Sequence, residues 1–201
     1  IRFGMDAVKI IEDANRRYLA VYHHPVNGVQ QTRLATSNDL LNWTFQAVIE
    51  PASSQPTIKK IPGKGFIVAL EKIGDGTNFC EKKGGCNMFN YYPDVNSLYK
   101  GVPNKTVVAP RTLSSCNEGT PNIYSAELNP DIDHSVIEVG FHYHQDCLLD
   151  RQAKATLTNF KAWTSEIDKP LNQRFENTGR FKGNIGDRDE FTYAGHNFLI
   201  I

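Results

Sequence analysis

The chain has 201 residues, enough for one domain with a hydrophobic core, and we treat residues 1–201 as a single domain. Lysine and arginine together number 22, and so do aspartate and glutamate, so the net charge is zero. This balance gives no electrostatic reason to expect nucleic acid or an anionic membrane as a partner. No apolar run reaches the roughly 18 residues that a membrane-spanning helix needs.

Strand patterns dominate the chain, whereas helical periodicity is scarce. In chain order, the sequence predicts strands at residues 7–11, 18–24, 32–37, 66–72, 135–145, 153–158 and 191–201. Turn clusters rich in proline, glycine, asparagine and aspartate separate them. Short strands at this spacing are typical of an all-β domain.

An internal repeat relates two parts of the chain that lie 120 residues apart. Residues 34–44 (LATSNDLLNWT) align with residues 154–164 (KATLTNFKAWT), and the same alanine, tryptophan and two threonines recur in both. Similar opening strands lie at 5–11, 54–60, 119–125 and 187–193. A repeated meander of this kind indicates β-propeller blades.

The repeat divides the chain into blades at residues 3–50, 53–112 and 116–168, followed by about half a blade from residue 183 onward. An open propeller leaves unpaired strand backbone at its edges. We therefore expect the propeller to be incomplete at the C-terminus and to be completed by further residues or by a second chain. A smaller, closed β-fold is the competing interpretation.

Cysteines and sequons point to an oxidising compartment. The four cysteines are Cys80, Cys86, Cys116 and Cys147. The simplest pairing is Cys80 with Cys86 and Cys116 with Cys147, although four cysteines allow three pairings. Glycosylation sequons begin at Asn42 and Asn104. Together these features favour a secreted, extracellular protein.

Several segments resemble motifs of the five-bladed propeller glycoside hydrolases, the families of arabinanases, xylosidases and invertases. TSNDLLNWT (36–44) resembles their S-x-D-L-x-x-W blade motif, and MDAVKII (5–11) is similar to their opening D-P-x-(V/I) strand. NEGTPNIYS (117–125) resembles their acid motif E-G-P-x-(I/L)-Y with Thr120 inserted, and GDRDEF (186–191) resembles their R-D-P strand. The resemblance implies a five-bladed propeller, of which this chain supplies about three and a half blades.

Glycoside hydrolysis needs one carboxyl group as a protonated acid and a second as an ionised base or nucleophile. The resemblance makes Asp6 the base or nucleophile and Glu118 the acid. Asp189, next to Arg188, would orient the substrate and tune the pKa of the acid. We read Asp6, Gln55 and Glu118 as equivalent first residues of the inner strands, with Asp187 or Asp189 in the fourth blade. The alternative is that these are turn residues that bond their own backbone.

Other side chains are candidates for binding the substrate. The set comprises Gln55, Arg188, His23, His144, Tyr91 and Tyr92. The two tyrosines belong to an aromatic insertion that we expect to form a loop at the channel mouth. His142 and His144 should face the same side of a strand, as polar channel lining or as metal ligands. No cofactor is required, and the resemblance allows an axial calcium or sodium ion, for which the sequence identifies no oxygen ligands.

These features predict a secreted carbohydrate-active protein, first of all a glycoside hydrolase acting on an oligo- or polysaccharide. Two alternatives remain open. One is a lectin-like or catalytically inactive propeller that binds glycans at the same mouth. The other is a protein-interaction propeller whose channel residues are structural only.

Overall fold

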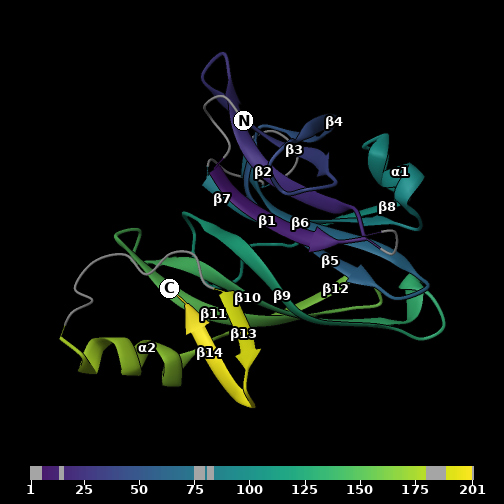
Figure 1. The fold of residues 1–201 in the computed structure, drawn as a ribbon. Helices are drawn as coiled ribbons and strands as arrows, with labels where there is room; N and C mark the ends of the chain where they lie inside the picture. The colour runs from purple at the N-terminus through teal and green to yellow at the C-terminus, as the bar shows by residue number, and fades with distance from the viewer. Residues whose placement is uncertain (1–5, 14–15, 75–79, 81–83, 180–188, 201) are drawn as a thin grey trace.

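The computed structural model describes residues 6–13, 16–74, 80, 84–179 and 189–200 (Figure 1). Three four-stranded antiparallel sheets and one two-stranded sheet make up this part of the chain. In each four-stranded sheet, hydrogen-bonded neighbours follow one another in sequence. We call these sheets blades 1, 2 and 3.

The elements follow the chain blade by blade. Blade 1 consists of β1 (Asp6–Glu12), β2 (Tyr18–Val26), β3 (Val29–Ser37) and β4 (Thr44–Pro51). Blade 2 consists of β5 (Ser53–Ile61), β6 (Gly65–Gly74), β7 (Gly84–Tyr92), α1 (Val95–Tyr99) and β8 (Lys105–Val108). Blade 3 consists of β9 (Glu118–Leu128), η1 (Ile132–His134), β10 (Ser135–Gln145), β11 (Leu149–Thr158) and β12 (Ala162–Ile167). The helix α2 (Lys169–Asn177) and the sheet of β13 (Asp189–Tyr193) and β14 (His196–Ile200) follow.

The predicted all-β architecture is confirmed, with three blades and part of another. The 120-residue repeat is a repeat of strand pairing, since Thr36 pairs with Thr44 and Thr156 pairs with Thr164. The two helices were not predicted. Helix α1 begins with a capping box, in which Asp94 and Ser97 each bind the other's backbone N–H.

Apolar side chains fill the space between neighbouring blades. Between blades 1 and 2 the core includes Leu19, Leu34, Val68, Leu70 and Tyr92. Between blades 2 and 3 it includes Ile67, Phe89, Ile137 and Leu157, with Trp163 packed against it. Burial of each such side chain contributes about 1.5–3 kcal/mol. This packing fixes the blades against one another and so fixes the positions of the strand ends.

Strands β1, β5 and β9 are the inner strands, with β1 beside β5 and β5 beside β9 (Figure 1). Each is interrupted near its start by a β-bulge at a residue with left-handed backbone: Ala7 (φ 48°), Gln55 (φ 47°) and Thr120 (φ 49°). Non-glycine residues rarely adopt this conformation. Bulges often re-aim side chains next to functional sites. The three inner strands therefore begin with one shared local geometry.

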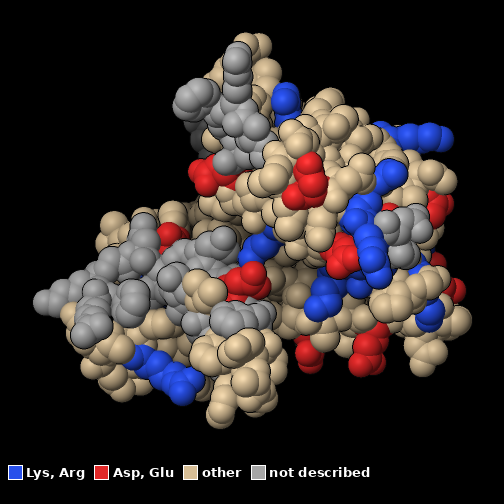
Figure 2. All heavy atoms as spheres, viewed as in Figure 1, with Lys and Arg blue, Asp and Glu red and all other residues tan. Residues whose placement is uncertain are grey.

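Both predicted disulfides are present, Cys80–Cys86 and Cys116–Cys147. They indicate an oxidising compartment. No helix in the described ranges is long and apolar enough to cross a membrane. Acidic and basic side chains intermingle on the face shown in Figure 2, as the zero net charge leads one to expect.

Candidate functional site

Strand pairing decides which residues are equivalent at the starts of the inner strands. In each blade, the residue just before the bulge pairs with a residue of the second strand. These pairs are Asp6 with His23, Ser54 with Glu71, and Gly119 with His142. In each pair, the residue of the inner strand is followed by the left-handed bulge residue. The three pairs therefore hold equivalent positions where the inner strands begin. We call this end of the inner strands the mouth.

This register corrects the expectation that Asp6, Gln55 and Glu118 are equivalent. The counterparts of Asp6 are Ser54 in blade 2 and Gly119 in blade 3. Gln55 follows that position and Glu118 precedes it. Because successive side chains of a strand point to opposite faces, the Glu118 side chain does not share the direction of a side chain at position 119. The sequence comparison was out of register by one residue in blades 2 and 3, in opposite directions.

Asp6 is presented to solvent and is oriented by two contacts. Its side chain is 85% exposed. Oδ1 accepts the N–H of Ala7 at 2.8 Å, and Oδ2 lies 3.5 Å from Nε2 of His23. The buried His23 ring accepts the N–H of Gln55 on Nδ1 at 3.2 Å. Because Nδ1 is an acceptor there, the proton of neutral His23 sits on Nε2 and faces Asp6.

Glu118 is 1% exposed and holds a loop. Its Oε1 accepts three backbone N–H groups, from Thr112 at 2.7 Å, Leu113 at 2.5 Å and Ser114 at 2.9 Å. Burial raises the pKa of the Glu118 carboxyl, and these backbone hydrogen bonds oppose the shift. The geometry is that of a loop anchor, and the role of Glu118 as an acid stays a prediction.

Glu71 is a carboxylate that the sequence analysis did not single out. Its Oε2 accepts the N–H of Thr120 at 3.2 Å, and its Oε1 lies 3.4 Å from Nδ2 of Asn117. A Cβ atom added to Gly119 would lie 2.8 Å from Cγ of Glu71, closer than real side chains approach. A Cβ atom on Gly85 would likewise lie 2.8 Å from Cδ of Glu71. The Glu71 carboxylate therefore fills the space that a side chain on Gly119, the blade 3 counterpart of Asp6, would take.

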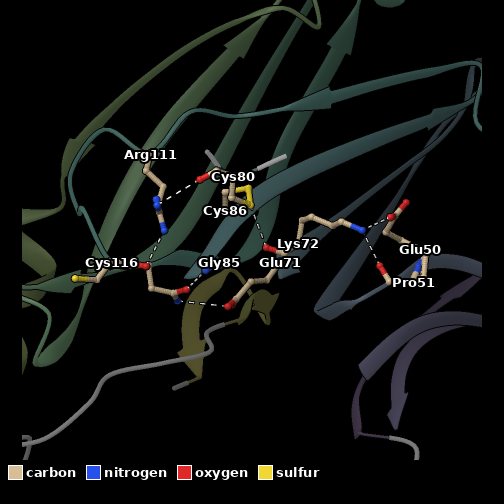
Figure 3. Close-up of a disulfide and its surroundings, with 10 residues drawn as sticks. Glu50, Pro51, Glu71, Lys72, Cys80, Gly85, Cys86, Arg111 and Cys116 are labelled. Carbon is tan, nitrogen blue, oxygen red and sulfur yellow. Dashed lines mark hydrogen bonds and ion pairs between the residues drawn. A yellow bond between two sulfur atoms is a disulfide. The ribbon is translucent and has the colours of Figure 1, made fainter. Parts of the chain in front are cut away.

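A rigid platform supports Glu71 (Figure 3). Arg111 donates from Nη1 to the carbonyl oxygen of Cys116 at 2.7 Å and from Nη2 to that of Cys80 at 3.3 Å. One guanidinium thus joins the backbones of the two disulfides. Asn117 accepts the backbone N–H of Gly85. These contacts hold the loops around Glu71 in place before any ligand arrives.

His142 and His144 face the same side of β10, as predicted. Their rings stack with centroids 6.2 Å apart, and Nε2 of His144 lies 2.7 Å from Oδ1 of Asp150. Nε2 of His142 lies 3.8 Å from the same oxygen. In the part of the chain that the structure describes, no group of three or more His, Cys, Asp or Glu residues could hold a metal ion. The pair is therefore best described as polar lining beside a carboxylate.

Asp189 lies at a cavity of about 470 Å³ that is lined by residues of the three inner strands and of β13. Its Oδ2 is 2.8 Å from Nζ of Lys9, and its Oδ1 accepts Nδ2 of Asn122 at 3.3 Å. Calcium needs six to eight oxygen ligands, whereas the one carboxylate among the described lining residues already binds an ammonium group. The axial calcium or sodium ion stays a prediction. Arg188 and Asp187 lie outside the described residues.

The expectation that Tyr91 and Tyr92 lie on an exposed loop is wrong. Both belong to β7, and both are buried, Tyr92 completely. Tyr91 packs edge-on against Phe160 and donates its hydroxyl to the carbonyl of Lys64 at 2.8 Å. Apolar residues from two blades surround these rings, so neither offers a free face to a sugar. Strand β7 shows no alternation of buried and exposed residues that could have marked it as a strand, because all its residues from Gly85 to Tyr92 are buried.

The two sequon asparagines, Asn42 and Asn104, are exposed. The side-chain Nδ2 of Asn42 donates to Oδ2 of Asp39 at 2.7 Å. Exposure is compatible with glycosylation at both positions, which stays a prediction.

Comparison with known proteins shows what this arrangement is similar to. No family model matches the chain, and no curated protein sequence matches it. Solved structures do match. A β-fructofuranosidase of glycoside hydrolase family 32 from Bombyx mori has a TM-score of 0.53 and 13% identity over 86% of this chain and 39% of its own. Fructan 1-exohydrolase IIa from Cichorium intybus has a TM-score of 0.51 and 12% identity over 81% and 31%.

A third match is a structure reported for glycoside hydrolase family 130, mannoside phosphorylases that include hydrolases of β-1,2 mannosidic linkages in Candida mannan. It has a TM-score of 0.55 and 16% identity over 97% of this chain and 61% of its own. The chain has the fold of the propeller glycoside hydrolases. It spans 31% to 61% of the length of these three structures. The likeness concerns the fold, and the chemistry of the mouth has to be argued from this chain's own residues.

Proposed function

We propose that this chain belongs to a secreted propeller that binds glycans, and that its binding site is the mouth that carries Asp6 and Glu71. The observation that carries the proposal is the position of Glu71. Its carboxylate lies where a side chain on Gly119, the blade 3 counterpart of Asp6, would lie. The mouth therefore has two carboxylates at equivalent positions of blades 1 and 3. The hydrolase-like fold supports a carbohydrate as the ligand.

The chemistry of both carboxylates suits sugar hydroxyl groups. Ionised carboxylates accept hydrogen bonds only, and hydroxyl groups donate them. Asp6 is held by the Ala7 N–H and the His23 ring, and Glu71 is held by the Thr120 N–H. Each carboxylate is therefore fixed in direction, which lowers the entropy lost when a ligand binds.

Binding without hydrolysis is favoured because Glu118, the acid that the resemblance to the propeller hydrolases implies, is not accessible to a ligand. Glu118 is buried and gives one oxygen to three backbone N–H groups. A general acid must come within hydrogen-bond reach of the glycosidic oxygen. Hydrolysis with Glu118 as acid is the second candidate, and the observation in its favour is the raised pKa of that carboxyl.

The test is a glycan array screen followed by calorimetric titration of each bound glycan. Asp6→Asn and Glu71→Gln should each weaken binding about tenfold or more, since hydrogen bonds to charged groups contribute ~1.5–3 kcal/mol. Glu127→Gln is the matched control, because Glu127 is an exposed carboxylate near the far end of β9. Equal affinity of all four proteins would remove Asp6 and Glu71 from the site.

The same glycans and a panel of aryl glycosides should then be incubated with the protein and analysed for products. Binding without product formation supports the glycan-binding proposal. Product formation that Asp6→Asn and Glu118→Gln both abolish would establish the hydrolase instead.

A further inference from the structure

Each blade turns one face of its sheet toward the next blade in the chain, and we call this its forward face. Because side chains alternate along a strand, every second residue of the second strand lies on this face. Counting back from His23, Glu71 and His142, the strand register gives the matching positions of the three blades. These are Leu19 and Val21 in blade 1, Ile67 and Ala69 in blade 2, and Glu138 and Gly140 in blade 3.

In blades 1 and 2 the forward face is apolar. The third-strand partners of Val21 and Ala69 are Leu34 and Phe89. Leu34 and Val21 belong to the core between blades 1 and 2. Phe89 and Ala69 belong to the core between blades 2 and 3. These side chains therefore form the surface against which the next blade packs.

The forward face of blade 3 carries charged side chains at the same positions. Lys154 pairs with Gly140, so it takes the position that leucine and phenylalanine hold in the other two blades. Glu166 of β12 pairs with Lys154, and its Oε1 lies 3.0 Å from Nζ of Lys154. Glu138, Lys154 and Glu166 are all exposed. The apolar stacking of blades 1 and 2 is thus not continued on this face.

Charged groups are poor packing partners for an apolar sheet. Burying an ion pair removes both charges from water, and the desolvation cost often exceeds the attraction between the two charges. The pair of Lys154 with Glu166 would meet this cost if another blade covered it. Glu138 adds a further carboxylate, whose Oε2 accepts Oγ of Ser125 at 2.9 Å. We therefore expect this face to stay in contact with water.

A cavity of about 550 Å³ lies on the forward face of blade 3. The described residues that line it belong to this blade, apart from Asp168, which follows β12 directly. They include the three charged residues named above and the hydroxyl side chains of Thr156, Thr164 and Ser165. Ligand sites commonly have volumes of roughly 300–1,000 Å³. The lining thus combines groups that only accept hydrogen bonds, one that only donates them, and hydroxyl groups that do both.

We propose that this cavity is a second binding site, separate from the mouth, and that it takes a saccharide without acidic groups. Sugar hydroxyl groups can donate to the carboxylates of Glu138 and Glu166 and can accept from the ammonium group of Lys154. Carboxylates outnumber ammonium groups among the described lining residues, so an acidic sugar is disfavoured. The class of ligand rests on the proposed function, whereas the position of the cavity does not depend on the mouth.

Acetylation of lysine side chains, read by mass spectrometry, tests whether the face is open. The hydrogen bond and the charge of Glu166 raise the pKa of Lys154, which slows acetylation by itself. The measurement therefore uses Glu166→Gln, in which Lys154 should react as fast as Lys161, an exposed lysine between β11 and β12. A blade packed on this face would shield Lys154, and slow reaction of Lys154 in this variant would overturn the proposal.

The ligand is tested on the wild type with the neutral glycans of the array, added in pools. At about ten times Kd only about a tenth of the sites are free, so acetylation of Lys154 should slow about tenfold. Acetylation of Lys161 should not change, and acidic glycans should not protect Lys154. If no neutral glycan protects Lys154, or if acidic glycans protect it equally, the proposal is wrong.

The dependence of this protection on glycan concentration gives the affinity of the cavity itself. Glu138→Gln should weaken it about tenfold, the effect of losing a hydrogen bond to a charged group. Glu127→Gln is the matched control, because Glu127 is an exposed carboxylate of the same blade. Asp6→Asn and Glu71→Gln should leave the protection of Lys154 unchanged, so failure of the mouth and failure of the cavity can be told apart. Equal affinity of Glu138→Gln and wild type would contradict the proposal.

Discussion

The carboxylate of Glu71 occupies the space that a side chain on Gly119 would take. Gly119→Ala should therefore displace Glu71 and destabilise the protein by about 1–3 kcal/mol, as overpacking does. In a Glu71→Ala background the same substitution should cost much less, because the obstructing group is gone. Urea denaturation of the four proteins measures this coupling, and additive effects of the two substitutions would contradict the described contact.

Glu118 should make stability depend on pH. Burial raises the folded-state pKa of its carboxyl above the usual 4.5. The contribution of this carboxyl to the free energy of unfolding is therefore complete below about pH 4.5, and it is lost as the pH rises through the folded-state pKa. The free energy of unfolding of wild type minus that of Glu118→Gln should fall as the pH increases from 4 to 8. A difference that stays constant or rises would show that burial does not dominate the pKa of Glu118.

The two disulfides should contribute unequally. They close loops with sequence separations of 6 for Cys80–Cys86 and 31 for Cys116–Cys147. Chain-entropy arguments give about 2 kcal/mol for the shorter loop and about 4 kcal/mol for the longer one. Chemical denaturation of the two double-serine variants should show this order. A larger loss on removing the shorter bridge would mean that local packing outweighs loop closure.

His23 should couple blade packing to the direction of Asp6. His23→Leu removes the acceptor for the Gln55 N–H and the ring beside Asp6, so both stability and glycan affinity should fall. His23→Gln retains an acceptor and a donor and should restore part of both. Loss of stability with unchanged affinity would mean that Asp6 needs no orientation by His23.

The blades could be predicted from the sequence because they rest on local and repeated signals. Alternating strands, turn clusters and the recurring Trp43 and Trp163 segments are all visible without a structure. The Cys80–Cys86 disulfide followed from the short separation of its cysteines, and Cys116–Cys147 followed as the simplest pairing of the other two. Strand β7 was harder, because Tyr91 and Tyr92 look like exposed aromatics until two blades are seen to enclose them.

The candidate site could be predicted only in part. Asp6 was found because it opens the first inner strand. Aligning Gln55-Pro56 with Thr120-Pro121 would have placed Gly119, rather than Glu118, opposite Asp6. Glu71 leaves no such signal in the sequence, because it reaches its place from β6 across the boundary between blades. Contacts of this kind depend on how the blades pack.

The central claim is that the mouth binds glycans through Asp6 and Glu71. Its most direct test is calorimetric titration of a glycan selected on the array into wild type, Glu71→Gln and the control Glu127→Gln. We predict that affinity falls about tenfold or more in Glu71→Gln and is unchanged in Glu127→Gln. A Glu71→Gln protein that remains folded and binds the glycan as tightly as wild type would contradict the claim.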